Sequence, residues 1–177
     1  MLVLVIGGSG SGKSEYAEQR ILEAGEPARY YVATMEPHGE EGQKRIARPR
    51  KLRAGKGFTT IECPTHLEKL QFDQQGAVLL EDLSNLLANE IWSEAGGGWT
   101  DDLAERVCQA VLKLEQNHRL VVVVGNDIHR EDDTLSTEME RFVTLLGECQ
   151  AGLAAAADEV TEVVCGIPLQ RKRRAES

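Results

Sequence analysis

The segment GGSGSGKS, residues 7–14, most constrains what this chain can fold into. It fits the Walker A pattern G-x-x-x-x-G-K-[S/T], between the apolar run LVLVI (2–6) and the helical pattern SEYAEQRILEAG (14–25), which Gly25 ends. In such a loop the backbone N–H groups point at phosphate oxygens, at the positive end of the helix dipole. A flexible glycine turn is the alternative, but the flanking strand and helix favour a nucleotide phosphate site.

The hydrophobic pattern of the rest of the chain alternates between strands and helices. Strand-like runs follow at residues 28–34, 77–82, 119–127 and 159–169, and helical stretches lie near 40–50, 84–95, 101–117 and 134–157. This order predicts an α/β fold, a doubly wound and mostly parallel sheet of the P-loop NTPase type with helices on both faces. We expect one nucleotide-binding domain over residues 1–177, in which residues from about 170 to 177 form a polar tail.

Composition excludes several classes of protein. The net charge of −9 argues against a general nucleic-acid partner, which needs an extended basic face. No apolar run approaches the roughly 20 residues that span a bilayer, and the apolar start lacks the basic leader of a signal peptide. The cysteines have no spacing that suits zinc and are interpreted as free thiols of a cytoplasmic protein.

The motif itself assigns the first site residues. The nucleotide-binding set is Gly7, Gly8, Ser9, Gly10, Ser11, Gly12, Lys13 and Ser14, with Thr34 and Asn126 at the ends of two other predicted strands. Lys13 places its charge at the β- and γ-phosphates of ATP or GTP, and the Ser14 hydroxyl binds Mg²⁺. The run AVLLED supplies a carboxylate, and we expect Glu81 rather than Asp82 to complete the metal site. Alternatively, both acids cap the following helix.

Several further sequence segments occur in a fixed order, and this order identifies a family more specifically than the Walker A loop does. They are YYVAT, KRIARPR followed by FTTIECP, LLEDLSNLLANEI, VVVVGND and LAAAADEVTEVVCGIPLQRK. With them, the chain resembles the bifunctional adenosylcobinamide kinase / adenosylcobinamide-phosphate guanylyltransferase family of cobalamin biosynthesis along nearly its whole length. The resemblance implies a P-loop fold, a homotrimer, and two reactions. One phosphorylates the aminopropanol hydroxyl of adenosylcobinamide, and the other transfers GMP from GTP to that phosphate.

The resemblance also implies a histidine that becomes guanylylated, in a segment similar to R-I-x-x-H. Arg45 and Ile46 match that segment, but Ala47, Arg48 and Pro49 follow, and the histidine is missing. A covalent nucleotidyl intermediate needs a nucleophile that loses its proton near neutral pH, which arginine does not do. Further departures are Asp82, where the family has a cysteine, and Cys149, where it has an asparagine before a glutamine.

The cations around the missing histidine have two interpretations. The segment RIARPRKLR, residues 45–53, carries five of them and is either a solvated face or a phosphate-binding helix in which Arg45 and Arg48 contact the nucleotide. His38 and His129 follow predicted strands, near the sheet edge where ligands bind, so they are the candidates to replace the histidine.

Three functional hypotheses remain from the sequence. The first is a kinase of adenosylcobinamide whose guanylyltransfer step is weakened or absent, the second is a non-catalytic or regulatory nucleotide-binding paralogue, and the third is a small-molecule kinase of another pathway. The intact Walker A loop favours the first, and the departures near the nucleotide favour the second. Shared fold does not exclude the third, because function lies in the site.

Overall fold

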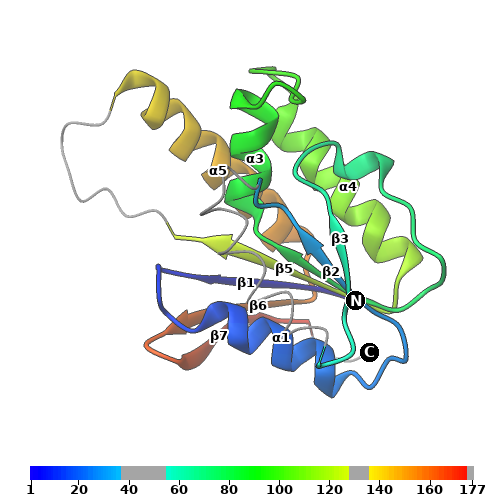
Figure 1. The fold of residues 1–177 in the computed structure, drawn as a ribbon. Helices are drawn as coiled ribbons and strands as arrows, with labels where there is room; N and C mark the ends of the chain where they lie inside the picture. Colours follow the sequence, from blue (N-terminus) through cyan, green and yellow to red (C-terminus); the bar gives the residue numbers. More distant parts are fainter. Residues whose placement is uncertain (37–54, 128–135, 175–177) are drawn as a thin grey trace.

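A computed structural model of the protein describes residues 1–36, 55–127 and 136–174, and these form a central sheet with helices on both sides (Figure 1). In chain order the elements are β1 (Leu2–Gly7), α1 (Lys13–Glu23), β2 (Arg29–Ala33), β3 (Thr59–Glu62), the 3₁₀ helix η1 (Leu67–Lys69), β4 (Ala77–Glu81), α3 (Leu83–Trp92), α4 (Leu103–Asn117), β5 (Leu120–Asn126), α5 (Thr137–Ala156), β6 (Glu159–Val164) and β7 (Ile167–Arg173).

The sheet has seven strands in the order β3-β2-β4-β5-β1-β6-β7. Every neighbouring pair is parallel except β6 and β7, so the prediction of a mostly parallel, doubly wound sheet is confirmed. Because parallel strands end at the same edge, the carboxyl ends of β1, β2, β4 and β5 lie together, beside the start of α1.

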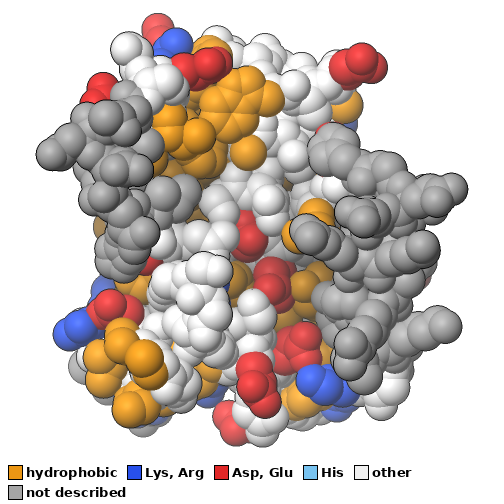
Figure 2. Space-filling view, turned by 60° about the vertical axis from the view of Figure 1, so that its left-hand side comes forward, with side chains coloured by type: hydrophobic (Ala, Val, Ile, Leu, Met, Phe, Trp, Pro, Cys, Tyr) orange, Lys and Arg blue, Asp and Glu red, His pale blue; other side chains and the backbone are white. Residues whose placement is uncertain are grey.

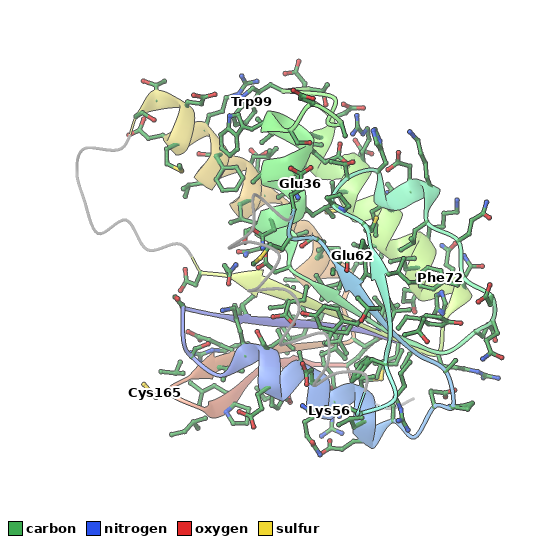
Figure 3. The ribbon with its side chains drawn as sticks, in the orientation of Figure 1. Glu36, Lys56, Glu62, Phe72, Trp99 and Cys165 are labelled. Carbon is green, nitrogen blue, oxygen red and sulfur yellow. The ribbon has the colours of Figure 1, made fainter. Side chains whose placement is uncertain are left out.

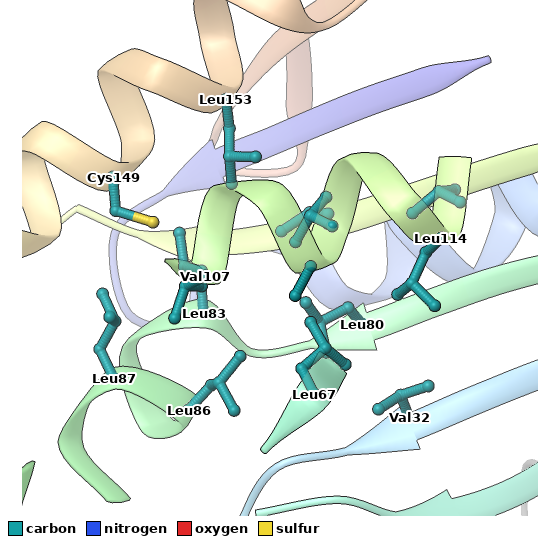
Figure 4. Close-up of a cluster of buried hydrophobic side chains, with 14 of the residues drawn as sticks. Val32, Leu67, Leu80, Leu83, Leu86, Leu87, Val107, Leu114, Cys149 and Leu153 are labelled. Carbon is teal, nitrogen blue, oxygen red and sulfur yellow. The ribbon is translucent and has the colours of Figure 1, made fainter. Parts of the chain in front are cut away.

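Alternate residues of the strands pack against different helices. Val3 and Val5 of β1 belong to the apolar cluster that contains Ala17 and Ile21 of α1. Leu2 and Leu4 belong to the larger cluster beneath α3, α4 and α5 (Figure 4). This continuous burial on both faces explains why the strands are uninterrupted apolar runs rather than alternating ones.

The structure corrects the sequence predictions at two places. Residues 159–169, predicted as one strand, form β6 and part of β7, joined at Cys165 and Gly166, whose φ angles of 50° and 79° suit a two-residue hairpin turn. The predicted polar tail is therefore wrong for residues 170–173, which pair with β6 as part of β7. Strand β3 was not predicted, since its four residues are exposed or half-buried and carry little apolar pattern.

The helix predicted near residues 40–50 lies outside the described residues. Within residues 1–36, 55–127 and 136–174, no helix combines the length and the apolar character needed to cross a membrane.

Candidate nucleotide site

The loop between β1 and α1 has the backbone that a phosphate site requires. Gly10 and Gly12 adopt left-handed φ angles of 69° and 90°, and Gly12 is the residue before α1. A Cβ atom at Gly7 would lie 2.6 Å from the carbonyl oxygen of Val163, so a larger residue does not fit there. These glycines let the chain turn tightly and present the free N–H groups of the first turn of α1 at the sheet edge.

Lys13 is the first residue of α1 and is largely buried, with 8% of its surface exposed. Its Nζ donates a hydrogen bond to the carbonyl oxygen of Gly8 at 3.1 Å, within the loop. The ammonium group is therefore held over the concave side of the loop, where the sequence predicts the β- and γ-phosphates.

Glu81 ends β4 and faces the same loop. Ser14 Oγ donates a hydrogen bond to Glu81 Oε1, and the Tyr31 hydroxyl donates to Glu81 Oε2 at 2.9 Å. Burial raises the pKa of the Glu81 carboxyl; the hydrogen bonds from Ser14 and Tyr31 lower it, and the nearby carboxylates of Asp82 and Glu18 raise it again. The net shift of the pKa is upward, because burial and the neighbouring negative charges outweigh the two neutral donors.

A magnesium ion fits these residues on chemical grounds. The hydroxyl of Ser14 and the carboxylate of Glu81 are hard oxygen ligands of the type that Mg²⁺ prefers. They come from different elements, α1 and β4, and already meet in a hydrogen bond.

Asp82 has a different position from Glu81, although the two are adjacent in sequence. Its Oδ1 accepts hydrogen bonds from the Asn85 N–H and the Ser84 hydroxyl, each at 2.7 Å, so Asp82 caps the start of α3. The capping alternative thus describes Asp82, whereas Glu81 contacts Ser14 and Tyr31.

Thr34 and Asn126, predicted at the nucleotide, tie the strand ends together. The Thr34 hydroxyl is completely buried and donates to the carbonyl oxygen of Asp82 at 2.9 Å. Asn126 Nδ2 donates to the Ser84 hydroxyl at 2.6 Å, and its own carbonyl oxygen accepts from Gln150 Nε2 at 2.9 Å. Both residues fix the geometry of the edge, and direct contact with a nucleotide stays a prediction.

Four of the predicted site residues, His38, Arg45, Arg48 and His129, lie outside the described residues. Lys56 is the cation of residues 44–56 that the structure describes, and its ammonium pairs with Glu18 of α1. The end of this cationic segment therefore lies beside the helix that follows the loop.

Sequence reasoning missed three side chains of this edge: Tyr31, Ser84 and Gln150. Tyr31 had a usable signal, because a two-residue period in ARYYVAT places it with Ala33 on the α1 side of the sheet. Ser84 and Gln150 act through hydrogen bonds between distant elements, for which the sequence holds no signal.

Figure 2 shows the face at this edge of the sheet, with acidic side chains in its middle and hydrophobic ones around them. A triphosphate needs cations to bind such a face, which Lys13 and a metal ion would supply. A separate cavity of about 710 Å³ lies between η1 and α4, lined by His66, Arg106 and Lys113 among others, but no residue of the loop lines it.

Comparisons with known proteins identify the family and support the fold. Residues 3–171 match the family of cobinamide kinase / cobinamide phosphate guanyltransferase. The chain is 30% identical to the bifunctional adenosylcobalamin biosynthesis protein CobU of Salmonella typhimurium (strain LT2) and 28% identical to that of Escherichia coli (strain K12), in each case over 97% of this chain and 100% of the relative. Among solved structures, an ATPase domain superposes with a TM-score of 0.52 over 91% of this chain and 68% of that chain at 12% identity, which supports the P-loop ATPase fold.

Proposed function

The chain belongs to the cobinamide kinase / cobinamide phosphate guanyltransferase family, and we propose that it uses ATP or GTP with Mg²⁺ to phosphorylate the hydroxyl group of adenosylcobinamide. One observation carries the proposal: Lys13, Ser14 and Glu81 converge on one glycine-rich loop at the carboxyl edge of the sheet. This arrangement suits transfer of a γ-phosphoryl group, a reaction that depends on positioning and charge stabilisation.

Each residue has a separate part in this reaction. The loop N–H groups and the Lys13 ammonium bind the phosphates and stabilise the negative charge that develops on them. Ser14 and Glu81 would hold Mg²⁺, which would supply positive charge to offset that of the triphosphate. Tyr31 donates to the second oxygen of Glu81 and so keeps the first oxygen directed at Ser14.

We further propose that this chain does not carry out guanylyltransfer through the covalent histidine intermediate of the family. The segment RIARPR offers alanine, arginine and proline at the positions after Arg45 and Ile46, and none of them is a nucleophile at neutral pH. The arginines stabilise negative charge instead, which supports the binding of a nucleotide or of a substrate phosphate.

The test is transfer of a labelled γ-phosphate from ATP or GTP to adenosylcobinamide, followed by chromatographic separation of the corrinoids. We expect labelled adenosylcobinamide phosphate that depends on Mg²⁺. Tight binding of a nucleotide without any transfer would refute the kinase proposal and favour a non-catalytic paralogue. Transfer to a different hydroxyl compound, with none to the corrinoid, would favour a kinase of another pathway.

A further inference from the structure

Two thiol groups meet between α4 and α5, away from the loop. The Sγ atoms of Cys108 and Cys149 are 3.6 Å apart, and Cys108 Sγ also donates a hydrogen bond to the carbonyl oxygen of Cys149 at 3.4 Å. All four cysteines of the chain are free thiols. The contact is between sulfurs of different helices, so joining them would crosslink two elements of the core.

A glycine makes this close approach of the helices possible. A Cβ atom at Gly152 of α5 would lie 3.2 Å from Cys108 Sγ, closer than ordinary packing allows. Gly152 follows Cys149 by three residues and therefore lies on the same side of α5. The absence of a side chain at position 152 thus gives the Cys108 sulfur room to pack closely against α5.

The two thiols differ in their environments. Cys149 is completely buried and points from α5 into the apolar cluster (Figure 4), whereas Cys108 is half-buried. The hydrogen bond between the two sulfur atoms lowers the pKa of the Cys108 thiol. The same hydrogen bond, together with burial, raises the pKa of the Cys149 thiol. Cys108 is also the more exposed of the two, so it is the thiol that an oxidant reaches first, with Cys149 beside it.

We propose that Cys108 and Cys149 form an oxidation site that reacts with a hydroperoxide and closes to an intramolecular disulfide between α4 and α5. The Cys108 thiolate attacks the peroxide, the O–O bond breaks, and a sulfenic acid forms while hydroxide leaves, or alkoxide from an organic peroxide; this leaving group takes up the proton that the Cys108 thiol gave to solvent and becomes water or an alcohol. The Cys149 sulfur then attacks the Cys108 sulfur, the S–O bond breaks, and its oxygen leaves as water with the Cys149 proton. Two electrons pass from the thiols to the peroxide.

The movement needed for the second step is small. A disulfide bond is about 2.05 Å long, so the sulfurs have to approach each other by about 1.5 Å from their present separation. Rotation of the side chains and a slight shift of α5 toward α4 supply such a change. A competing thiol would have to come from solvent, while Cys149 is already in place.

The disulfide would also act on the nucleotide site, because Gln150 follows Cys149 directly. Gln150 Nε2 donates to the carbonyl oxygen of Asn126, and Asn126 contacts Ser84 beside Asp82. A Cβ atom at Gly125 would lie 2.9 Å from Gln150 Nε2, so the side chain fits closely against β5. A shift of α5 therefore displaces a hydrogen bond at the carboxyl edge of the sheet.

The thiol test uses the wild-type protein at low concentration, treated with hydrogen peroxide and then denatured. We expect the number of thiols to fall from four to two, a mass loss of two hydrogens, and a peptide that links Cys108 to Cys149 and separates on reduction. Loss of thiols without this linked peptide would overturn the proposal, as would four intact thiols after prolonged treatment. These readouts do not depend on any nucleotide activity.

The other cysteines provide matched controls. Cys165 is exposed at the tip of the β6–β7 hairpin (Figure 3), and Cys63 is buried with a pKa raised to about 11 by burial, Glu68 and Glu90. The double variant Cys63→Ser/Cys165→Ser should still form the disulfide, and Cys108→Ser should not. We expect the oxidised protein to bind Mg²⁺-nucleotide about fivefold or more weakly until it is reduced. Unchanged affinity of the crosslinked protein would refute the connection through Gln150.

Discussion

Replacement of Lys13 by methionine tests the assignment of the loop most directly. Methionine has a similar length and an apolar stem, so it fills the largely buried space that Lys13 occupies while removing the ammonium group. The free protein loses one hydrogen bond, from Nζ to the carbonyl oxygen of Gly8, worth about 1 kcal/mol. Removing the ammonium group also removes the free-energy cost of holding a charge in a largely buried site. The two effects oppose each other, so the stability of the nucleotide-free protein should change little.

The effect on nucleotide binding should be larger than the effect on stability. A charge-assisted contact between Lys13 and phosphate oxygens is worth about 1.5–3 kcal/mol. Since 1.4 kcal/mol corresponds to about a tenfold change in affinity, Lys13→Met should raise Kd for the triphosphate about 10- to 150-fold. The loss should be smaller for a monophosphate nucleotide, which presents no β- or γ-phosphate to the amine.

Calorimetric titration with ATP and GTP in Mg²⁺ measures these constants, and thermal unfolding checks that the variant is folded. Lys172→Met is the matched control, because Lys172 Nζ also donates to backbone carbonyls, those of Ala154 and Ala155 at the end of α5. The control should leave Kd unchanged. Equal affinity of Lys13→Met and the wild type would show that the loop does not hold phosphate.

Three further predictions concern the acidic and nucleophilic groups. Glu81→Gln should reduce the Mg²⁺ dependence of nucleotide binding more than Asp82→Asn does, because asparagine at position 82 still caps the helix. A larger effect of Asp82→Asn in the titration would show that Asp82, and not Glu81, is the metal-binding carboxylate. The pKa of the Glu81 carboxyl is raised above its ordinary 4.5, so the wild-type protein loses stability as the pH rises from 4.5 through the pKa of Glu81 in the folded protein. The nucleotide-free Glu81→Gln variant should lack this loss and therefore be more stable than the wild type at neutral pH. Equal stability of the two in unfolding experiments from acid to neutral pH would contradict that reasoning. Incubation with α-labelled GTP and Mg²⁺, then alkaline denaturation, should leave no label on the protein; acid-labile label lost in His38→Ala or His129→Ala would identify a substitute nucleophile.

Apolar runs predicted the inner strands of the sheet well, for a physical reason. Strands β1, β2, β4 and β5 are buried on both faces, so each is a continuous hydrophobic segment that a turn signal ends. The strands at the edges of the sheet are not required to be apolar on both faces. Strand β3 has exposed or half-buried residues throughout, and β7 is exposed over most of its length, so neither needs an apolar pattern to pair with its neighbour.

Some residues of the candidate site were likewise predictable from the sequence, and others were not. The loop residues and Lys13 were predictable because a phosphate imposes a local backbone and a fixed spacing, which the sequence preserves as GGSGSGKS. The choice between Glu81 and Asp82 needed the strand register, which sets which of two adjacent carboxylates faces the loop. The two-residue period of β2 indicates which side of the sheet Tyr31 faces, but no local pattern encodes its contact with Glu81, which is far away in sequence.

The two reactions of the family place different demands on a chain, and under the proposed function this difference would explain how one could persist without the other. Phosphoryl transfer from a bound triphosphate needs positions: a loop, a lysine and oxygen ligands, all held at the sheet edge by the same packing that forms the core. Lys13, Ser14 and Glu81 are the residues that we propose for those positions, at the start of α1 and the end of β4. Guanylyltransfer through a covalent intermediate needs one nucleophile in addition, which the family resemblance leads us to expect in the segment RIARPR, outside the described residues. Under the proposed function, loss of that nucleophile would remove the second reaction and leave the residues proposed for the first in place.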